Sequence, residues 1–372
     1  MSPRNLPRMN ATFARCLGLL TTLAWAISAS AAPTLYFPPV TGDWETVAPA
    51  AAGWDAAKLQ QALDLAGKRN SSGVVILLHG RLLAEQYWQP ETTGEAGQRY
   101  RRIMQGRDDA GHVIEDVASV QKSVAAMLVG IAQHQGLLKL ADPVEKYLGK
   151  GWSKASPEQE QTITLRHLVT MTSGLDEDLK FEAAAGTRWR YNSAAYSRTV
   201  DVLAAAAKKT PNELTKEWLT GRIGMKHSSW VERAGTPEQA RINPRGFATT
   251  ARDLARFGLL VLAEGKWNGE TIIADQEYLR TALKPSQKLN PSYGYLWWLN
   301  GQPEVARGAG QKVKGPLIPG APADLVAALG AVDRKLYVVP SRGLVVTRLG
   351  NATGPNFDNE FWKALMAAAP AK

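Results

Sequence analysis

The chain has 372 residues, of which 45% are hydrophobic and 21% are charged, and its formal net charge is +10. This composition is typical of a globular protein with one large domain or two closely associated ones, and it excludes a mainly disordered chain. Lys and Arg are interspersed with acids and form no block, so we expect no nucleic-acid partner. Binding to an anionic polymer or surface would rest on net charge alone.

Residues 1–31 are predicted to be a signal peptide. Positive residues without any acid precede a mostly apolar run over residues 16–27, and Ala29-Ser30-Ala31 suits cleavage near the bond between Ala31 and Ala32. The run is short for a membrane span, so we expect a periplasmic or secreted protein with no stable span after signal removal; an uncleaved anchor is the alternative. Cys16, the only cysteine, lies in this segment, which excludes cysteine catalysis in the mature chain.

A helix and a β-hairpin are predicted at the front of the mature domain, which spans residues 32–372. Residues 55–68 have helical spacing of apolar side chains, with an acid at the start and basic residues at the end. Residues 74–78 and 82–88 are apolar runs separated by His-Gly-Arg, which is the pattern of a hairpin with a glycine-containing turn. The polar segment 89–111 is predicted to be a long loop.

The arrangement Ser119-Val120-Gln121-Lys122 precedes an apolar run over residues 124–131. A helix brings residues at i and i+3 onto one face, and Glu115 and Asp116 suit the positive end of that helix. A serine hydroxyl needs a base to become a good nucleophile, and a lysine can be that base where burial or neighbouring cations lower its pKa. Ser-x-x-Lys therefore indicates a nucleophile with its base; for the motif alone, an exposed helix start with a solvated lysine is the alternative.

The middle third is predicted to be mainly helical, over about residues 120–235. Helices are expected at residues 163–175, after the loop 186–193, and at residues 211–224. This helical subregion separates the strand-forming parts at the two ends of the chain.

The C-terminal part returns to strands. Residues 246–260 are predicted to be a Thr-capped helix, residues 293–299 an aromatic strand, and residues 300–323 a loop. Three strand-like runs and a final helix follow, at residues 325–331, 335–340, 343–348 and about 356–368. We therefore predict an α/β fold of the α+β type, in which both chain ends build an antiparallel sheet flanked by terminal helices, with the helical region inserted.

These features resemble, in their order, the β-lactamase-like serine hydrolases: class C β-lactamases, D-alanyl-D-alanine carboxypeptidases, and related esterases and amide hydrolases. The resemblance runs from about residue 55 to the C-terminus. It rests on the hairpin, the Ser-x-x-Lys motif, and the segments 168–175, 186–193, 246–260 and 325–348. It implies the β-lactamase/transpeptidase-like fold and a serine hydrolase that works through an acyl-enzyme.

The resemblance also implies roles for individual residues. Ser119 would be the nucleophile, Lys122 its proton acceptor or the group that tunes it, and Tyr191 the tyrosine that moves protons to the leaving group and later to and from water. A phenol titrates near 10 in water, so this role needs a nearby cation to favour the phenolate, and Lys122 is the candidate. The N–H groups of Ser119 and Ala331 would form the oxyanion hole, with Gly330 allowing a close backbone approach.

Two positions depart from the family pattern. Ser193 stands where the family usually has asparagine; its hydroxyl can donate one hydrogen bond to Lys122 or to a substrate carbonyl, but it lacks the paired functions of an amide. Asn192 would compensate only if the loop is shifted. Ala328-Leu329-Gly330 stands where the family has Lys-Thr-Gly or His-x-Gly, so the charge that usually holds a substrate carboxylate is missing. Ser193, Leu329 and Gly330 are the predicted substrate-binding residues.

The missing charge argues against efficient penicillin or D-Ala-D-Ala cleavage and favours a neutral, small or peptide-like ester or amide, although Arg334 or Lys335 could supply charge from nearby. A non-catalytic binding protein of the same fold and a weak β-lactamase or DD-peptidase are the alternatives. The five histidines show no metal-ligand spacing, so no metal or other cofactor is expected. Trp189, Trp297 and Trp298 could line an apolar acyl pocket or belong to the core.

Overall fold

The computed structural model describes residue 1 and residues 34–233 and 242–371. Contacts divide the chain into two units, residues 1–34 and 35–372, and the fold described below is that of the second unit. The predicted signal peptide lies outside the described residues, apart from Met1. In the part of the chain that is described, no helix combines the length and the apolar character needed to cross a membrane.

A six-stranded antiparallel sheet is formed by both ends of this unit, in the order β2-β1-β14-β13-β12-β9. The strands are β1 (Ser71–Leu78), β2 (Arg81–Tyr87), β9 (Trp298–Leu299), β12 (Val326–Leu329), β13 (Lys335–Val339) and β14 (Leu344–Gly350). The first hairpin pairs with the last strand through β1 and β14, as the sequence predicts. The predicted fold class is therefore confirmed.

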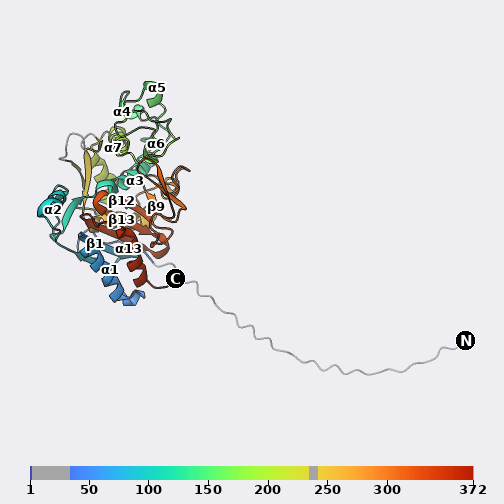
Figure 1. Cartoon of the computed structure of the whole chain (residues 1–372). Helices are drawn as coiled ribbons and strands as arrows, with labels where there is room; N and C mark the ends of the chain where they lie inside the picture. Colours follow the sequence, from blue (N-terminus) through green and yellow to red (C-terminus); the bar gives the residue numbers. More distant parts are fainter. Residues whose placement is uncertain (2–33, 234–241, 372) are drawn as a thin grey trace. The chain divides into compact units, whose positions relative to one another are not determined.

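The two faces of the sheet bury different helices, because successive side chains of a strand point to opposite faces. In β1, Val74 and Ile76 pack in one hydrophobic cluster with the terminal helices α1 (Ala56–Lys68) and α13 (Phe357–Ala368). Val75 and Leu77 pack in the other cluster, with α3 (Gln121–His134) and α11 (Ala251–Leu262). Figure 1 shows α1 and α13 next to each other beside the sheet strands. The predicted terminal helices therefore cover one face.

The helical region follows α3 and reaches Ile223. It contains α4 (Glu145–Leu148), α5 (Pro157–Glu160), α6 (Leu165–Val169), α7 (Ser193–Ala207), α8 (Pro211–Thr215), a π-helical turn η3 (Lys216–Thr220) and α9 (Gly221–Ile223). The helix predicted over residues 163–175 is only α6. The chain leaves the helix because Met171 takes a left-handed φ of 60° and Gly174 a φ of 74°, conformations that a helix cannot contain.

A second, four-stranded sheet has the order β3-β4-β6-β5 and contains β3 (Met104–Arg107), β4 (Val113–Asp116), β5 (Ser229–Glu232) and β6 (Arg245–Thr249). The loop predicted over residues 89–111 is wrong, because this segment forms the helix α2 (Gly94–Arg101) and β3. The expected helix start at Glu115 and Asp116 is also wrong, since both residues lie in β4, paired with β6. The pairing comes from residues more than a hundred positions away, which local patterns do not reveal.

Three further predictions in the C-terminal part need correction. The helix predicted from residue 246 begins only at Ala251, where Thr250 caps α11, because residues 245–249 form β6. The aromatic strand shortens to β9, since Leu296 has a left-handed φ of 58°. The predicted 300–323 loop contains a hairpin, β10–β11. In the described part of the chain, the remaining elements are η1 (Ala50–Ala52), η2 (Ala118–Val120), β7 (Lys266–Trp267), β8 (Glu270–Thr271), α12 (Gln276–Ala282), β10 (Glu304–Arg307), β11 (Gln311–Lys314), η4 (Ala331–Asp333) and η5 (Pro340–Arg342).

Gly258 tests the close contact between α11 and the sheet. A Cβ at this position would lie 2.5 Å from Val345 Cγ1 and 2.6 Å from Leu336 Cδ1. We expect Gly258→Val to lower the free energy of unfolding by about 1–3 kcal/mol in urea denaturation, because the helix must move away from the sheet. Gln61→Val, at an exposed position of α1, is the control and should cost under about 0.7 kcal/mol. Equal losses in the two variants would contradict this packing.

Candidate active site

Ser119 lies in a short turn between β4 and α3. The turn is the 3₁₀ segment η2 (Ala118–Val120), and α3 continues directly from it. Ala118 has a left-handed φ of 50°, and Asp116 Oδ1 accepts a hydrogen bond of 2.9 Å from the Ala118 N–H. A non-glycine residue with this φ is strained, and such residues cluster at functional sites. The strand, the strained residue and the helix together fix the position of Ser119.

Lys122 donates a hydrogen bond of 2.9 Å from Nζ to Ser119 Oγ, as the i, i+3 spacing predicts. The lysine is 1% exposed. Burial lowers its pKa to about 7, and the Arg233 cation adds to this effect, whereas the Asp116 carboxylate opposes it. At and above neutral pH a large share of the Lys122 amine is therefore neutral and able to accept the hydroxyl proton of Ser119.

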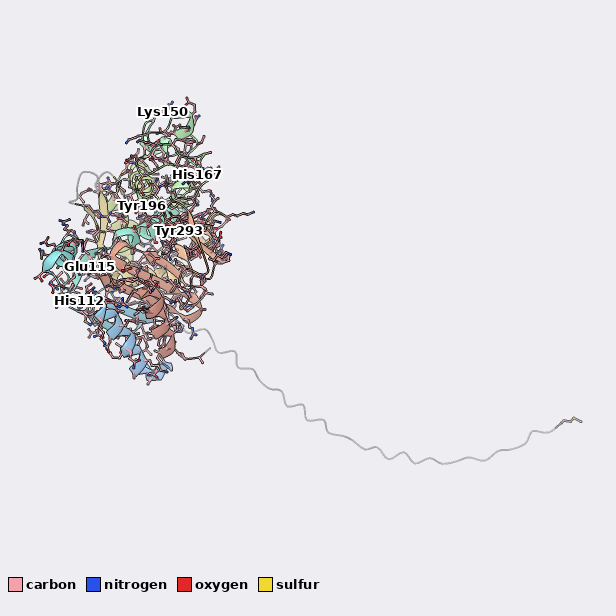
Figure 2. All side chains as sticks on the ribbon, viewed as in Figure 1. His112, Glu115, Lys150, His167, Tyr196 and Tyr293 are labelled. Atoms are coloured by element: carbon pink, nitrogen blue, oxygen red, sulfur yellow. The ribbon has the colours of Figure 1, made fainter. Side chains whose placement is uncertain are left out.

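Two tyrosine rings enclose the Lys122 amine. Its Nζ lies 4.9 Å from the ring centroid of Tyr191 and 4.6 Å from that of Tyr196, which Figure 2 labels. Burial raises the pKa of Tyr191 to about 12, although a hydrogen bond with Ser119 acts in the opposite direction. The expectation that Lys122 would hold Tyr191 as a phenolate is therefore wrong. At neutral pH Tyr191 is a phenol, which makes it a proton donor.

Asn192, in the loop before α7, uses its side-chain amide for hydrogen bonds within the fold. Its side-chain N–H₂ donates to the carbonyls of Leu175 and Asp176, both at 2.8 Å, and its Oδ1 accepts the Ala195 N–H at 3.0 Å as the N-cap of α7. All the functions of this amide are used in the fold, so Asn192 does not replace the family's asparagine. Ser193 is the first residue of α7 and is partly exposed.

The end of β12 lies against the serine turn. A Cβ on Gly330 would clash with the carbonyl oxygen of Val117 and would lie 3.2 Å from Val120 Cγ2, so only glycine permits this approach. In the described part of the chain, β9 pairs with β12 only at Val326 and Ala327. Leu329 and Gly330 therefore present a strand edge next to the serine turn, and Ala331 opens the following turn η4.

Neither Arg334 nor Lys335 supplies charge to this edge, so that possibility is ruled out. Arg334 is 2% exposed and its Nε lies 3.2 Å from Glu115 Oε2. Lys335 is 6% exposed, and its Nζ lies 3.1 Å from Asp358 and 3.2 Å from Asp333. Both cations are committed to buried or half-buried carboxylates. Ala328 itself is buried.

The three candidate tryptophans take different positions. Trp297 is fully buried and stacks on Phe257, so it is a core residue. Trp189 is also buried, in a group of rings with Tyr191 and Trp298. Trp298 is half-buried and stacks on Tyr191, with ring centroids 5.7 Å apart and planes at 22°. Of the three, Trp298 therefore offers an apolar wall beside the site.

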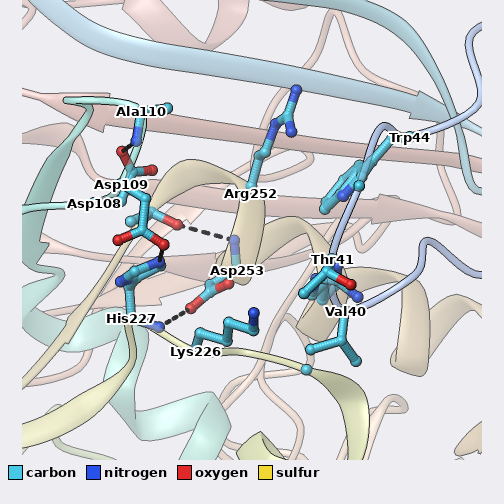
Figure 3. Close-up of a pocket in the computed structure, with 14 residues that line it drawn as sticks. Val40, Thr41, Trp44, Asp108, Asp109, Ala110, Lys226, His227, Arg252 and Asp253 are labelled. Atoms are coloured by element: carbon cyan, nitrogen blue, oxygen red, sulfur yellow. Dashed lines mark hydrogen bonds and ion pairs between the residues drawn. The ribbon is translucent and has the colours of Figure 1, made fainter.

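A separate cavity of about 310 Å³ lies between residues 40–44 and α11, and Figure 3 shows several of its lining side chains. Asp253, Arg252, His227 and Trp44 are among them, and none of the predicted site residues lines it. It is therefore not the pocket of Ser119. No cluster of three or more potential metal ligands is found among the described residues.

Several residues around the site were missed by the sequence analysis. Asp116 receives a bidentate ion pair from Arg233, with Nε and Nη2 at 2.7 and 3.0 Å. Tyr196 faces Lys122, and its hydroxyl has no hydrogen-bond partner among the described residues. An acid three residues before the nucleophile was the one signal for Asp116. The contacts of Arg233 and Tyr196 depend on tertiary structure, which a local pattern does not contain.

Known proteins are similar to most or part of this chain. Residues 56–371 match the family model described as Beta-lactamase. An uncharacterized protein of Alkalihalophilus pseudofirmus is 26% identical over 319 residues, which cover 80% of this chain and 87% of that protein. The D-alanyl-D-alanine-carboxypeptidase/endopeptidase AmpH of Escherichia coli is 26% identical over 170 residues, or 38% of this chain and 43% of that protein.

Solved structures show the same fold. A Bacillus anthracis protein described provisionally as a 6-aminohexanoate-dimer hydrolase matches with a TM-score of 0.64 and 16% identity, over 90% of this chain and 88% of that one. At this identity the likeness concerns the fold alone. The family resemblance seen in the sequence is confirmed.

Arg233→Met tests the electrostatic control of Lys122. The change removes a cation that lowers the pKa of Lys122 and leaves Asp116, which raises it, without its bidentate partner. The pKa of Lys122 should therefore rise. In a pH profile of the rate at which a fluorophosphonate modifies Ser119, the acidic limb should move from near pH 7 to higher pH. Arg252→Met, which breaks a bidentate pair with Glu85 elsewhere, should leave the limb in place. An unmoved limb in Arg233→Met would refute this control.

Lys122→Met should make the protein more stable and unreactive. The lowered pKa means that burying the charged lysine destabilises the folded state. This loss of stability is fully present below pH 7, because the lysine is protonated in both the folded and the unfolded state. It disappears as the pH rises from about 7 to 10.5. Denaturation at pH 6 and pH 10 should show the larger gain from methionine at pH 6. The Ser119 reaction rate should fall by roughly 10²–10⁴. A gain that does not depend on pH would contradict the lowered pKa.

Proposed function

Because this chain belongs to the Beta-lactamase family, and its relatives include hydrolases, we propose that it is an exported serine hydrolase that cleaves an ester or amide bond through an acyl-enzyme on Ser119. One observation carries the proposal: Ser119 Oγ accepts a hydrogen bond from a fully buried lysine whose pKa is lowered to about 7. This is the pairing of a nucleophile with a base that is ready to accept its proton.

Acylation would use Ser119, Lys122 and Tyr191 in turn. The neutral Lys122 amine takes the proton of Ser119 Oγ while the oxygen attacks the substrate carbonyl carbon. The tetrahedral oxyanion is then stabilised by the N–H groups of Ser119 and Ala331. As the bond to the leaving group breaks, Tyr191 donates its proton to the leaving oxygen or nitrogen and regains a proton from the Lys122 ammonium. The net result is an acyl-Ser119 ester, a protonated leaving group and a neutral lysine.

Deacylation would run the same route with water as the acceptor. A water molecule attacks the acyl carbonyl, and its proton passes to Lys122, directly or through Tyr191. The Ser119 oxygen then leaves and is reprotonated, which restores the starting enzyme. A Tyr191 pKa of about 12 supports the donor role, because the phenol keeps its proton until a basic leaving group develops.

A neutral substrate fits the edge of the pocket best. Ala328 carries no charge at the position where the family has Lys or His, and the neighbouring Arg334 and Lys335 are occupied by Glu115, Asp333 and Asp358. The edge at Leu329 and Gly330, which β9 leaves unpaired in the described part of the chain, suits pairing with an extended amide or ester backbone. The half-buried ring of Trp298 suits an apolar group.

Two alternatives follow from specific observations. AmpH, a D-alanyl-D-alanine-carboxypeptidase/endopeptidase, favours peptide-like substrates and weak activity of that kind or on β-lactams. Ser193, which stands where the family has asparagine, favours a binding protein that has lost turnover. Export to the periplasm or beyond rests on the predicted signal peptide with cleavage near Ala31.

Covalent labelling of Ser119 tests the hydrolase proposal. The mature protein treated with a fluorophosphonate should gain the mass of one adduct, and it should hydrolyse a nitrophenyl ester. Ser119→Ala should lose the adduct and at least about 10³-fold of the turnover, because Ser119 Oγ is the one oxygen that the Lys122 amine hydrogen-bonds among the described residues. Ser193→Ala, which leaves the nucleophile and base intact, is the control and should still be labelled. A folded wild-type protein without adduct and without turnover would favour the binding protein.

A further inference from the structure

A buried ionic cluster is centred on Glu115, a residue of β4 that Figure 2 labels. This carboxylate is fully buried and accepts hydrogen bonds from Ser72, from the Tyr100 hydroxyl at 2.6 Å, from the Gly350 N–H at 3.0 Å and from Arg334 Nε at 3.2 Å. Glu115 belongs to β4, four residues before Ser119. The cluster is therefore tied directly to the strand that delivers the nucleophile.

Two buried arginines of the same region hold the turn η4 by its carbonyl groups. Arg334 Nη1 donates to the Ala331 carbonyl at 2.9 Å. Arg348 Nη1 donates to the carbonyls of Val332 and Asp333, at 3.4 and 3.0 Å. The Gly330 N–H closes the turn by donating to the Arg334 carbonyl at 2.8 Å. All three residues of η4 thus accept a hydrogen bond from a buried guanidinium.

The turn needs this support because its backbone is strained. Val332 and Asp333 both have left-handed conformations, with φ of 59° and 64°. A β-branched residue such as valine rarely takes this conformation, and it persists only where the surroundings enforce it. The strain lies directly after Ala331, whose N–H is the proposed second donor of the oxyanion hole. The direction of that N–H therefore depends on the hydrogen bonds from the arginines.

We propose that the Glu115–Arg334 pair, assisted by Arg348, is a clamp that sets the spacing between the two donors of the oxyanion hole. Glu115 fixes the strand that leads to Ser119, and Arg334 fixes the turn that contains Ala331. The ion pair joins the two segments, which lie 219 positions apart in the sequence. The inference rests on the proposed hydrolase function and adds positioning residues that do not touch the substrate.

A purely structural role explains this cluster less well. A buried ion pair contributes little net stability, since the desolvation of both charges offsets their attraction. Apolar side chains could fill the same volume. What they could not do is donate hydrogen bonds to three successive carbonyls of a strained turn. The cluster therefore matches a requirement for geometry, because an oxyanion hole works only when its donors lie at hydrogen-bond distance from the developing charge.

Arg334→Met and Arg334→Lys, compared on a nitrophenyl ester and on the matching thionoester, test the clamp. Sulfur is a poor hydrogen-bond acceptor, so the ratio of ester to thionoester turnover reports the oxyanion hole. In Arg334→Met we expect kcat for the ester to fall by about 10²–10³ with little change in KM, and the ratio to fall with it. Arg334→Lys keeps a cation beside Glu115 and should recover part of the loss.

Arg256→Met is the matched control for losing a buried guanidinium. Arg256 is 3% exposed and donates to the carbonyls of Pro38 and Ile223, far from η4 in the sequence. Arg256→Met should lower the melting temperature without changing the ratio of ester to thionoester turnover. If Arg334→Met does not fold, Arg334→Lys decides by the same ratio.

The outcomes separate the two proposals. A wild-type protein that turns over the ester, with folded Arg334 variants of unchanged ratio, would refute the clamp and leave the hydrolase proposal intact. A wild-type protein that neither turns over the ester nor labels at Ser119 would refute the hydrolase proposal, and the clamp with it. A ratio that falls in both Arg334 variants and not in Arg256→Met would support the clamp.

Discussion

The burial of Lys122 is the constraint on which the site depends. A lysine amine in water is protonated at neutral pH and cannot take a proton from serine. Here the amine is buried against the rings of Tyr191 and Tyr196. This burial, together with the nearby cation of Arg233, lowers its pKa to about 7. The surrounding core therefore creates the base, and any change that admits water would remove it. The same burial keeps Tyr191 protonated, so one environment sets opposite proton states on the two groups.

Sequence patterns predicted the parts of the protein that depend on near neighbours. The apolar runs of β1 and β14, the spacing of α1 and the i, i+3 relation of Ser119 and Lys122 are all local, and the structure contains each of them. The parts that were wrong depend on distant partners: Glu115 lies in a strand because β6 pairs with it. The sequence left open whether Arg334 or Lys335 supplies charge to the pocket, because strand alternation does not show which carboxylate a buried cation meets. Tertiary contacts decided those positions.

Strain and support occur together around the nucleophile. Ala118 on one side and Val332 with Asp333 on the other take left-handed conformations, and each segment is held by a buried or half-buried charged side chain. Gly330 lets the two segments meet, because a side chain there would collide with the Val117 carbonyl. Charges that add little to stability are retained where the backbone must keep an unfavourable shape.

The strand order has a consequence for how the protein is made. β1 and β14 are neighbours in the middle of the sheet, yet 277 positions separate Ser71 and Arg348, which share a hydrogen bond across that pair. The central ladder therefore cannot form until nearly the whole polypeptide has been synthesised, and contacts of such long range close slowly. A nascent chain of this topology stays open while it emerges from the ribosome.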